Sequence, residues 1–407
     1  MTSEWNHFAL GEITELVIDY RGKTPKKLGG DWCKQGYRAL SAKNIKTGRI
    51  VQAETIRYID ESLYRKWMKD EVQRGDILIT SEAPFGQIFF WDSDEKIVLS
   101  QRLFCVRIKP EYDARFIYYY MTTPEFQSEL DGRATGTTVI GLRQPELMKC
   151  IIRCPEIQEQ KVIAAILSSI DAKIIANEKV NDNLEQQLRT IFKAEFTDNP
   201  ELENITQIPL SELCHVVTKG TTPTTLGKPF VESGINFIKA ESILDDHSID
   251  KSKFAFIDEE TNALLKRSII HAGDVVFTIA GTLGRFALID ENVLPANTNQ
   301  AVAIIRADVE KVLPEYIYTC FIGEWHTDYY AKCVQQAVQA NLSLTTIKSL
   351  PIPLLDEAKM SEYLSLILPL IKAIKTNEAQ NEKLAALRDN LLPKLMSGEI
   401  DVSAVQL

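Results

Sequence analysis

Basic residues gather in one N-terminal segment of a chain that is acidic as a whole. Residues 19–43 hold two acidic residues, Asp19 and Asp31, whereas the 407-residue chain has a formal net charge of -10. The seven basic residues of this segment are Arg21, Lys23, Lys26, Lys27, Lys34, Arg38 and Lys43. The overall charge argues against a protein that coats an anionic polymer by bulk attraction, but a local basic surface can still bind phosphate groups. The alternative interpretation is a solvated turn.

Motifs for catalysis are missing from the sequence. It has no Asn-Pro-Pro-aromatic or Asp-Pro-Pro-Tyr motif of an adenine methyltransferase and no Gly-x-Gly cofactor turn, and Gly220 to Lys228 lacks the spacing of a P-loop. Glu159 and Lys161 have the spacing of a nuclease Glu-x-Lys motif, but they open a predicted helix instead of lying on a strand. The five histidines are scattered and show no zinc spacing. We therefore expect no catalytic residue, no cofactor and no metal.

The second half of the chain repeats the first at an offset of 198 to 200 residues. Residues 21–25, Arg-Gly-Lys-Thr-Pro, recur as residues 219–223, Lys-Gly-Thr-Thr-Pro, and the Gly-Asp strand at 75–80 recurs at 273–278. A period near 200 residues is too long for a solenoid, so each copy is a domain-sized unit. Each copy begins with short β-rich runs and Gly/Pro turns, which predict an α+β globular domain.

The second part of each copy, about residues 156–195 and 356–396, is rich in helix-forming residues. From Ile163 to Ile191 the seam residues recur at alternating steps of four and three, which is the spacing of a coiled coil, and the second helix repeats the pattern. Two polar positions in each seam would fix the register of the helices at some cost in stability. They are Asn177, Asn181, Asn377 and Asn381. The alternative is that each helix packs on its own domain.

The short linker after the first helix favours antiparallel pairing of the two helices. Residues 197–207 span at most ~40 Å when extended, whereas a helix of about 38 residues is ~57 Å long. Parallel pairing would force the chain back along that whole length before the second domain begins. Pro369, where the first copy has Ser169, predicts a kink or an interruption near the start of the second helix.

Further short motifs occur in the same order in both copies. They are Leu-x-Glu-Ile-like openings at 10–13 and 210–213 and proline and acidic residues before each helix at 155–161 and 351–357. A further motif occurs once, at the C-terminal end, in residues 391–400. Together with two α+β domains that alternate with two long helices, they resemble the specificity subunits of type I restriction–modification systems. The resemblance covers essentially the whole chain.

The resemblance implies a non-catalytic DNA sequence-specificity subunit. Each globular domain would be a target recognition domain that binds one half of a bipartite double-stranded DNA site. The helices would space the two domains and dock two methyltransferase (modification) subunits, and restriction endonuclease or translocase subunits could join the complex. The alternative function is a tandem coiled-coil scaffold that recruits protein partners without sequence-specific DNA binding.

A domain that reads a DNA half-site needs Lys and Arg for phosphates and amide, hydroxyl or guanidinium groups for base edges. In the first domain the expected loop contacts are Arg21, Lys23, Lys26, Lys27, Lys43, Asn44, Ser81, Gln101, Arg102, Arg133 and Thr137. In the second domain they are Lys219, Thr221, Thr222, Lys239, Thr278, Asn299, Gln300, Gln336 and Asn341. Because the two sets differ in chemistry, the two half-sites should differ in sequence.

The predicted architecture is therefore α+β, with two target recognition domains in a tandem pseudo-two-fold repeat, separated by two long helices that form an antiparallel coiled coil. The expected boundaries are 1–154 for the first domain, 155–196 for the first spacer helix, 197–354 for the second domain and 355–407 for the second helix and tail. The sequence shows no apolar stretch of the roughly 20 residues that a membrane helix needs and no secretory signal. Its seven cysteines are odd in number and scattered, so we expect a cytoplasmic protein with reduced thiols.

Overall fold

The computed structural model of the chain describes residues 5–136, 140–199, 205–335 and 341–405. The chain forms two compact units: unit 1 comprises residues 1–173 and 384–407, and unit 2 comprises residues 174–383. Each unit has its own sheets and hydrophobic cores. Both unit boundaries fall inside the two long helices, so each helix contributes residues to both units.

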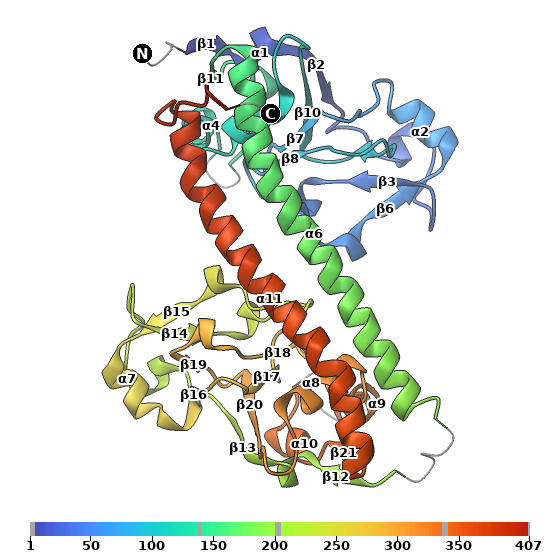
Figure 1. Ribbon diagram of the computed structural model, residues 1–407. Helices are drawn as coiled ribbons and strands as arrows, with labels where there is room; N and C mark the ends of the chain where they lie inside the picture. Colours follow the sequence, from blue (N-terminus) through green and yellow to red (C-terminus); the bar gives the residue numbers. More distant parts are fainter. Residues whose placement is uncertain (1–4, 137–139, 200–204, 336–340, 406–407) are drawn as a thin grey trace. The chain divides into compact units, whose positions relative to one another are not determined.

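Unit 1 is built around a four-stranded antiparallel sheet (Figure 1). Its order is β2 (Thr14–Asp19), β10 (Leu103–Ile108), β7 (Ile77–Thr80), β8 (Ile88–Phe90). A second sheet has the order β6 (Arg57–Ile59), β3 (Tyr37–Leu40), β9 (Val98–Leu99). Two further pairs of strands are β1 (Asn6–Ala9) with β11 (Ile151–Cys154) and β4 (Ile45–Lys46) with β5 (Arg49–Ile50). The short helices are α1 (Leu10–Ile13), α2 (Glu61–Trp67), α3 (Ala114–Met121), α4 (Pro124–Arg133) and α5 (Gln144–Leu147), with 3-10 turns η1 (Lys26–Leu28), η2 (Ala42–Asn44) and η3 (Ala53–Thr55).

The central strand β7 is buried along its whole length, and its first three residues are apolar because both faces of the strand are covered. Successive side chains of a strand point to opposite faces. Ile77 and Ile79 accordingly belong to a core with Phe116 of α3, whereas Leu78 belongs to a second core with Trp67 of α2. The four-stranded sheet is thus sandwiched between two cores, and the second core attaches the three-stranded sheet to it.

Unit 2 repeats this arrangement. Its main sheet has the order β13 (Cys214–Lys219), β20 (Val302–Ala307), β17 (Val275–Thr278), β18 (Phe286–Leu288). The second sheet has the order β15 (Ala255–Ile257), β14 (Ile235–Ile238), β19 (Ala296–Thr298), β16 (Ile269–Ile270), and β12 (Gln207–Pro209) pairs with β21 (Pro351–Pro353). The short helices are α7 (Glu259–Leu264), α8 (Pro314–Ile322), α9 (Thr327–Gln335) and α10 (Leu344–Lys348), with 3-10 turns η5 (Leu210–Glu212), η6 (Pro223–Leu226), η7 (Ala240–Ser242), η8 (Lys251–Lys253), η9 (Lys266–Ser268) and η10 (Glu291–Val293). The same strand order in both units confirms the predicted tandem repeat.

The repeated Gly-Asp motif has a structural role that is the same in both units. Asp76 is 1% exposed, and both of its carboxylate oxygens lie 2.8 Å from the Arg107 guanidinium. Asp274 of unit 2 is equally buried and accepts two bonds of 2.7 Å from Arg306. Each pair ties the first residues of a central strand to the neighbouring strand of the main sheet.

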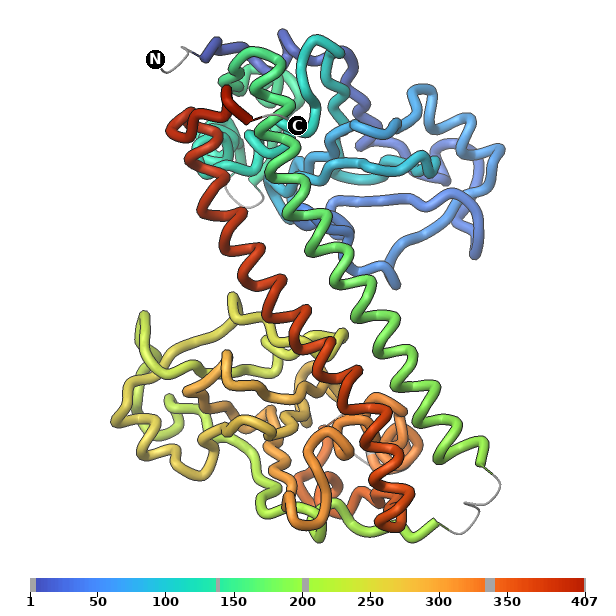
Figure 2. The backbone as a smooth tube through the Cα atoms, in the orientation of Figure 1, coloured from blue at the N-terminus to red at the C-terminus, as the bar shows by residue number. Residues whose placement is uncertain are grey.

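The two long helices are α6 (Ile157–Phe196) and α11 (Glu357–Met396). In unit 1 the start of α6 shares a core with the end of α11, through Leu167 and Leu395 among others. In unit 2 the end of α6 shares a core with the start of α11, through Leu188 and Ile367. The helices therefore run in opposite directions (Figure 2), which confirms the predicted antiparallel pairing.

The four seam asparagines meet in unit 2 as two pairs. Asn177 Nδ2 donates to Asn381 Oδ1 at 2.8 Å, and Asn377 Nδ2 donates to Asn181 Oδ1 at 2.8 Å. The remaining amide donors reach backbone: Asn181 Nδ2 lies 3.4 Å from a carbonyl of α11, and Asn381 Nδ2 lies 3.5 Å from a carbonyl of α6. This exchange is symmetric between the helices, and a shift of either helix by one turn would break both pairs.

Helix α11 continues through Pro369 without a break, so the interruption expected there is wrong. Tyr363, Ile367 and Ile371 on either side of the proline are buried in the core of unit 2. Their packing holds the helix together where the proline removes one backbone hydrogen bond, and the ring itself faces outward. Among the described residues, no helix is long and apolar enough to cross a membrane.

Candidate functional site

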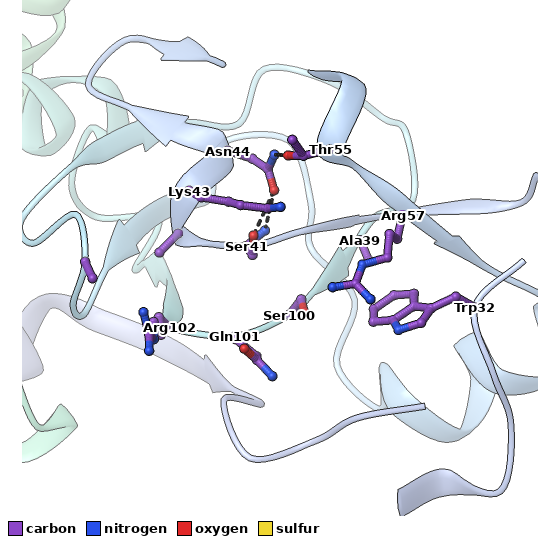
Figure 3. Close-up of a pocket in the computed structure, with 12 residues that line it drawn as sticks. Trp32, Ala39, Ser41, Lys43, Asn44, Thr55, Arg57, Ser100, Gln101 and Arg102 are labelled. Carbon is purple, nitrogen blue, oxygen red and sulfur yellow. Dashed lines mark hydrogen bonds between the residues drawn. The ribbon is translucent and has the colours of Figure 1, made fainter. Parts of the chain in front are cut away.

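A hollow of about 250 Å³ opens on unit 1 where three chain segments converge (Figure 3). One segment runs from the end of β3 through η2, the second joins η3 to β6, and the third is the turn between β9 and β10. Residues of these segments that line the hollow include Ser41, Lys43, Asn44, Thr55, Arg57, Ser100, Gln101 and Arg102, and Trp32 closes one side. The hollow thus brings together four residues that the sequence predicted, Lys43, Asn44, Gln101 and Arg102.

Asn44 shapes this hollow from the inside. Its side chain is 1% exposed, and its Oδ1 accepts bonds from the backbone N and the Oγ of Ser41 at 3.1 and 2.9 Å. Its Nδ2 donates to the carbonyl of Gln52 at 3.2 Å and to Thr55 Oγ1 at 3.0 Å. Because the amide is fully engaged within unit 1, Asn44 holds the two walls of the hollow together and presents no free group to a ligand.

Three cationic side chains remain at the surface of the hollow. Lys43, Arg57 and Arg102 are exposed, and the Arg57 guanidinium lies 4.6 Å above the Trp32 ring. The nearest carboxylate to Arg102 is that of Glu82, at 3.8 Å. Within the part of the chain that the structure describes, Lys43 and Arg57 form no ion pair. Their charge is therefore available to an anionic or electron-rich ligand.

Most of the other predicted basic contacts of unit 1 are bound to the unit itself. Arg21 makes two bonds of 2.8 Å to Asp19, and Lys23 Nζ lies 2.5 Å from the carbonyl of Trp67 and 3.5 Å from the centre of the Tyr20 ring. Burial lowers the pKa of Lys23. Lys27 donates to the Gly22 carbonyl, Arg133 pairs with Glu129 at 2.9 Å, and Lys26 is exposed. The first basic segment is thus only partly a free cationic surface.

One further predicted contact of unit 1, Ser81, is buried instead of lying at the surface. Ser81 follows β7 and is 1% exposed, so a DNA base could not reach its hydroxyl without a rearrangement. The backbone N of Leu142 donates to the Ser81 carbonyl at 2.9 Å. Thr137 lies outside the described residues.

The predicted contacts of unit 2 are engaged in a similar way. Thr278 is fully buried and accepts from the backbone N of Arg285 at 2.8 Å, so it stabilises the β17–β18 turn. Lys239 lies 3.2 Å from Glu241, and Asn299 accepts from a backbone N two residues on at 3.0 Å. Thr221 accepts a hydrogen bond from Arg267, and Thr222 donates one to Gln300. Lys219 is half-buried and Asn341 is exposed. Gln336 lies outside the described residues.

Among the aromatic and charged residues of the unit 1 hollow, Trp32 and Arg57 were absent from the sequence prediction. Arg57 reaches the hollow because β6 pairs with β3 in a register that places Arg57 opposite Ala39. No local spacing reveals that register. The position of Trp32 inside the basic segment was the one available signal, since an aromatic ring among basic residues often supports a guanidinium.

A family model described as a type I restriction modification DNA specificity domain matches this chain twice, over residues 2–186 and 203–386. The chain belongs to this specificity family. The type I restriction enzyme MjaIX specificity subunit of Methanocaldococcus jannaschii is 24% identical over 344 residues, which cover 81% of this chain and 78% of that protein. The EcoBI specificity subunit of Escherichia coli is 22% identical over 354 residues, which cover 80% and 73%.

A solved structure has the same fold. The crystal structure of a type I restriction–modification S subunit from M. genitalium matches with a TM-score of 0.56 at 16% identity, and the match covers 96% of each chain. Each match of the specificity family spans one α+β domain and most of the long helix after it. Membership confirms the resemblance inferred from the sequence and favours a non-catalytic specificity subunit over a tandem scaffold.

Proposed function

We propose that unit 1 and unit 2 each bind one half of a bipartite double-stranded DNA target. The observation that carries the proposal is the unit 1 hollow, which Lys43, Arg57, Arg102 and Gln101 all line. Basic side chains neutralise phosphates, and guanidinium and amide groups read base edges in the major groove. Two similar units in one chain suit a divided site in the way that two-fold dimers suit two half-sites.

We further propose that the paired helices dock two methyltransferase subunits and that restriction subunits can join this complex. The two asparagine pairs support this arrangement because they fix one register of α6 against α11 and so present a constant surface to each partner. The complex would act in the cytoplasm, where its DNA substrate lies.

A selection from random double-stranded oligonucleotides tests the DNA-binding proposal. The complex of this chain with its methyltransferase partner should enrich a split motif, two defined sequences separated by a spacer of fixed length. The same selection at several salt concentrations gives the number of phosphate contacts. Recovery of salt-sensitive binding without any sequence motif would contradict the proposal and support a scaffold.

The purified chain alone should neither methylate nor cleave DNA. The sequence contains no methyl-donor or nuclease motif, and the chain belongs to a family of specificity subunits. Transfer of a radiolabelled methyl group to DNA that contains the selected motif provides the measurement. The complete complex serves as the positive control, and methyl transfer by the isolated chain would contradict the assigned role.

Exchange of residues 10–150 for the equivalent segment of another family member should change one half of the selected motif and preserve the other. The segment contains the main sheet and the second sheet of unit 1 and the whole of the core between them, so it carries its own recognition surface. The selection described above is the measurement, and it also assigns each half-site to a unit. A change in both halves would show that one unit does not read one half-site.

A further inference from the structure

The residues around the unit 1 hollow have defined counterparts in unit 2. Strand β3 pairs with β6 and β9, and β14 pairs in the same way with β15 and β19. The buried Asn44 corresponds to the buried Ser242, and both accept a bond from the backbone N three residues earlier, at 3.1 and 3.3 Å. The correspondence therefore rests on strand pairing and hydrogen bonds as well as on the sequence offset.

The cationic residues of the hollow are not conserved between the two units. Arg57 pairs with Ala39, the second-last residue of β3, and Ala255 pairs with the second-last residue of β14. Arg57 therefore corresponds to Ala255. By the same strand correspondence, Lys43 and Arg102 match Glu241 and Ala301. Gln101 keeps its type, because its counterpart is Gln300. Unit 1 thus has a guanidinium chemistry at this place that unit 2 lacks.

Arg57 is the best-placed of the three cations to read a base. Its guanidinium lies 4.6 Å above the Trp32 ring, which restricts its plane without using its hydrogen-bond donors. In the described part of unit 1 it has no carboxylate partner, whereas Arg102 lies near Glu82. Figure 3 shows the Arg57 guanidinium directed across the hollow from the side of Trp32.

We propose that Arg57 binds the major-groove edge of a guanine in the half-site of unit 1, with Trp32 as a positioning residue. The inference rests on the proposed DNA-reading function and specifies its ligand. Guanine presents two acceptors, O6 and N7, that match the donor fork of an arginine, and this contact is the commonest specific one in DNA recognition. Lys43 and Arg102 then contact phosphates. Ala255 leaves unit 2 without this guanine contact.

The test is motif selection with the complete methyltransferase complex that carries Arg57→Lys, Arg57→Ala or Trp32→Ala. Arg57→Lys keeps the charge but loses the planar fork. In both Arg57 variants we expect the preference for guanine over other bases to fall about 5- to 150-fold at one position of the unit 1 half-site. Arg57→Lys should leave the salt dependence of binding unchanged, and Trp32→Ala should weaken discrimination at the same position.

Two controls make the outcomes separable. Arg65→Ala removes an exposed arginine of α2 that pairs with Glu61, and it should leave both half-sites unchanged. The half-site of unit 2 is an internal control, because its unchanged sequence shows that a variant is folded and assembled.

Uniform weakening of binding across all DNA sequences would mean that Arg57 contacts a phosphate, and an altered preference at a base pair without guanine would mean a different ligand. Either result overturns the inference. A parent complex that selects no motif would instead contradict the proposed function.

Discussion

Insertion of seven residues into both long helices is expected to lengthen the spacer of the DNA target by about three base pairs. Seven helical residues rise ~10 Å, and one base-pair step is about 3.4 Å. The insertions belong after Asn181 in α6 and before Asn377 in α11, because these points lie on the same side of the asparagine pairs in an antiparallel arrangement. Both pairs then keep their partners, and the seam stays in phase.

Insertion into one helix alone should abolish tight binding. The seven added residues would have no partner on the other helix, so the two units could not engage both half-sites at once, and the affinity should fall by about 10²-fold or more. The double insertion also turns the second half-site by about a third of a turn, at about 10.5 base pairs per turn, so some loss of affinity is expected there too. Motif selection measures the spacer directly. An unchanged spacer with undiminished affinity would show that the helices do not set the separation.

Substitution Arg107→Ala is expected to destabilise unit 1 by about 3–5 kcal/mol, since removal of one partner leaves a buried charge unpaired. Asp76 is 1% exposed, and besides Arg107 it accepts from the backbone N of Gln73 at 2.8 Å. The measurement is amide hydrogen exchange in β7 and β10, which should accelerate by about two to three and a half orders of magnitude.

The equivalent substitution in the repeat provides a matched control. Arg306→Ala removes the partner of Asp274 and should accelerate exchange in β17 and β20 while β7 and β10 keep their protection. Arg74→Ala removes an exposed pair with Asp92 and should change exchange little, because exposed ion pairs contribute little to stability. Equal acceleration in both units after Arg107→Ala would show that the two sheets unfold together and that the effect is not local to this pair.

Much of the candidate site could not be predicted from residue type and loop position. Lys43, Gln101 and Arg102 do meet at one hollow, and each is exposed as a ligand contact requires. Asn44 and Thr278 have groups that suit the reading of bases, but these groups form hydrogen bonds with the backbone and with neighbouring side chains. A buried polar group must be paired, and whether its partner is internal depends on contacts between segments far apart in the sequence.

The sequence by itself determined the doubled α+β architecture, the two long helices and their opposite directions. These properties follow from repeats, from the spacing of apolar residues and from chain length, all of which are local or periodic and can be counted along the chain. Only the tertiary structure decided which charges are free. Arg21 is neutralised by Asp19, whereas Arg57 is set over Trp32 by the register of β6 against β3. Register depends on packing across the whole unit, and it decides which charged groups of the surface can contact a ligand.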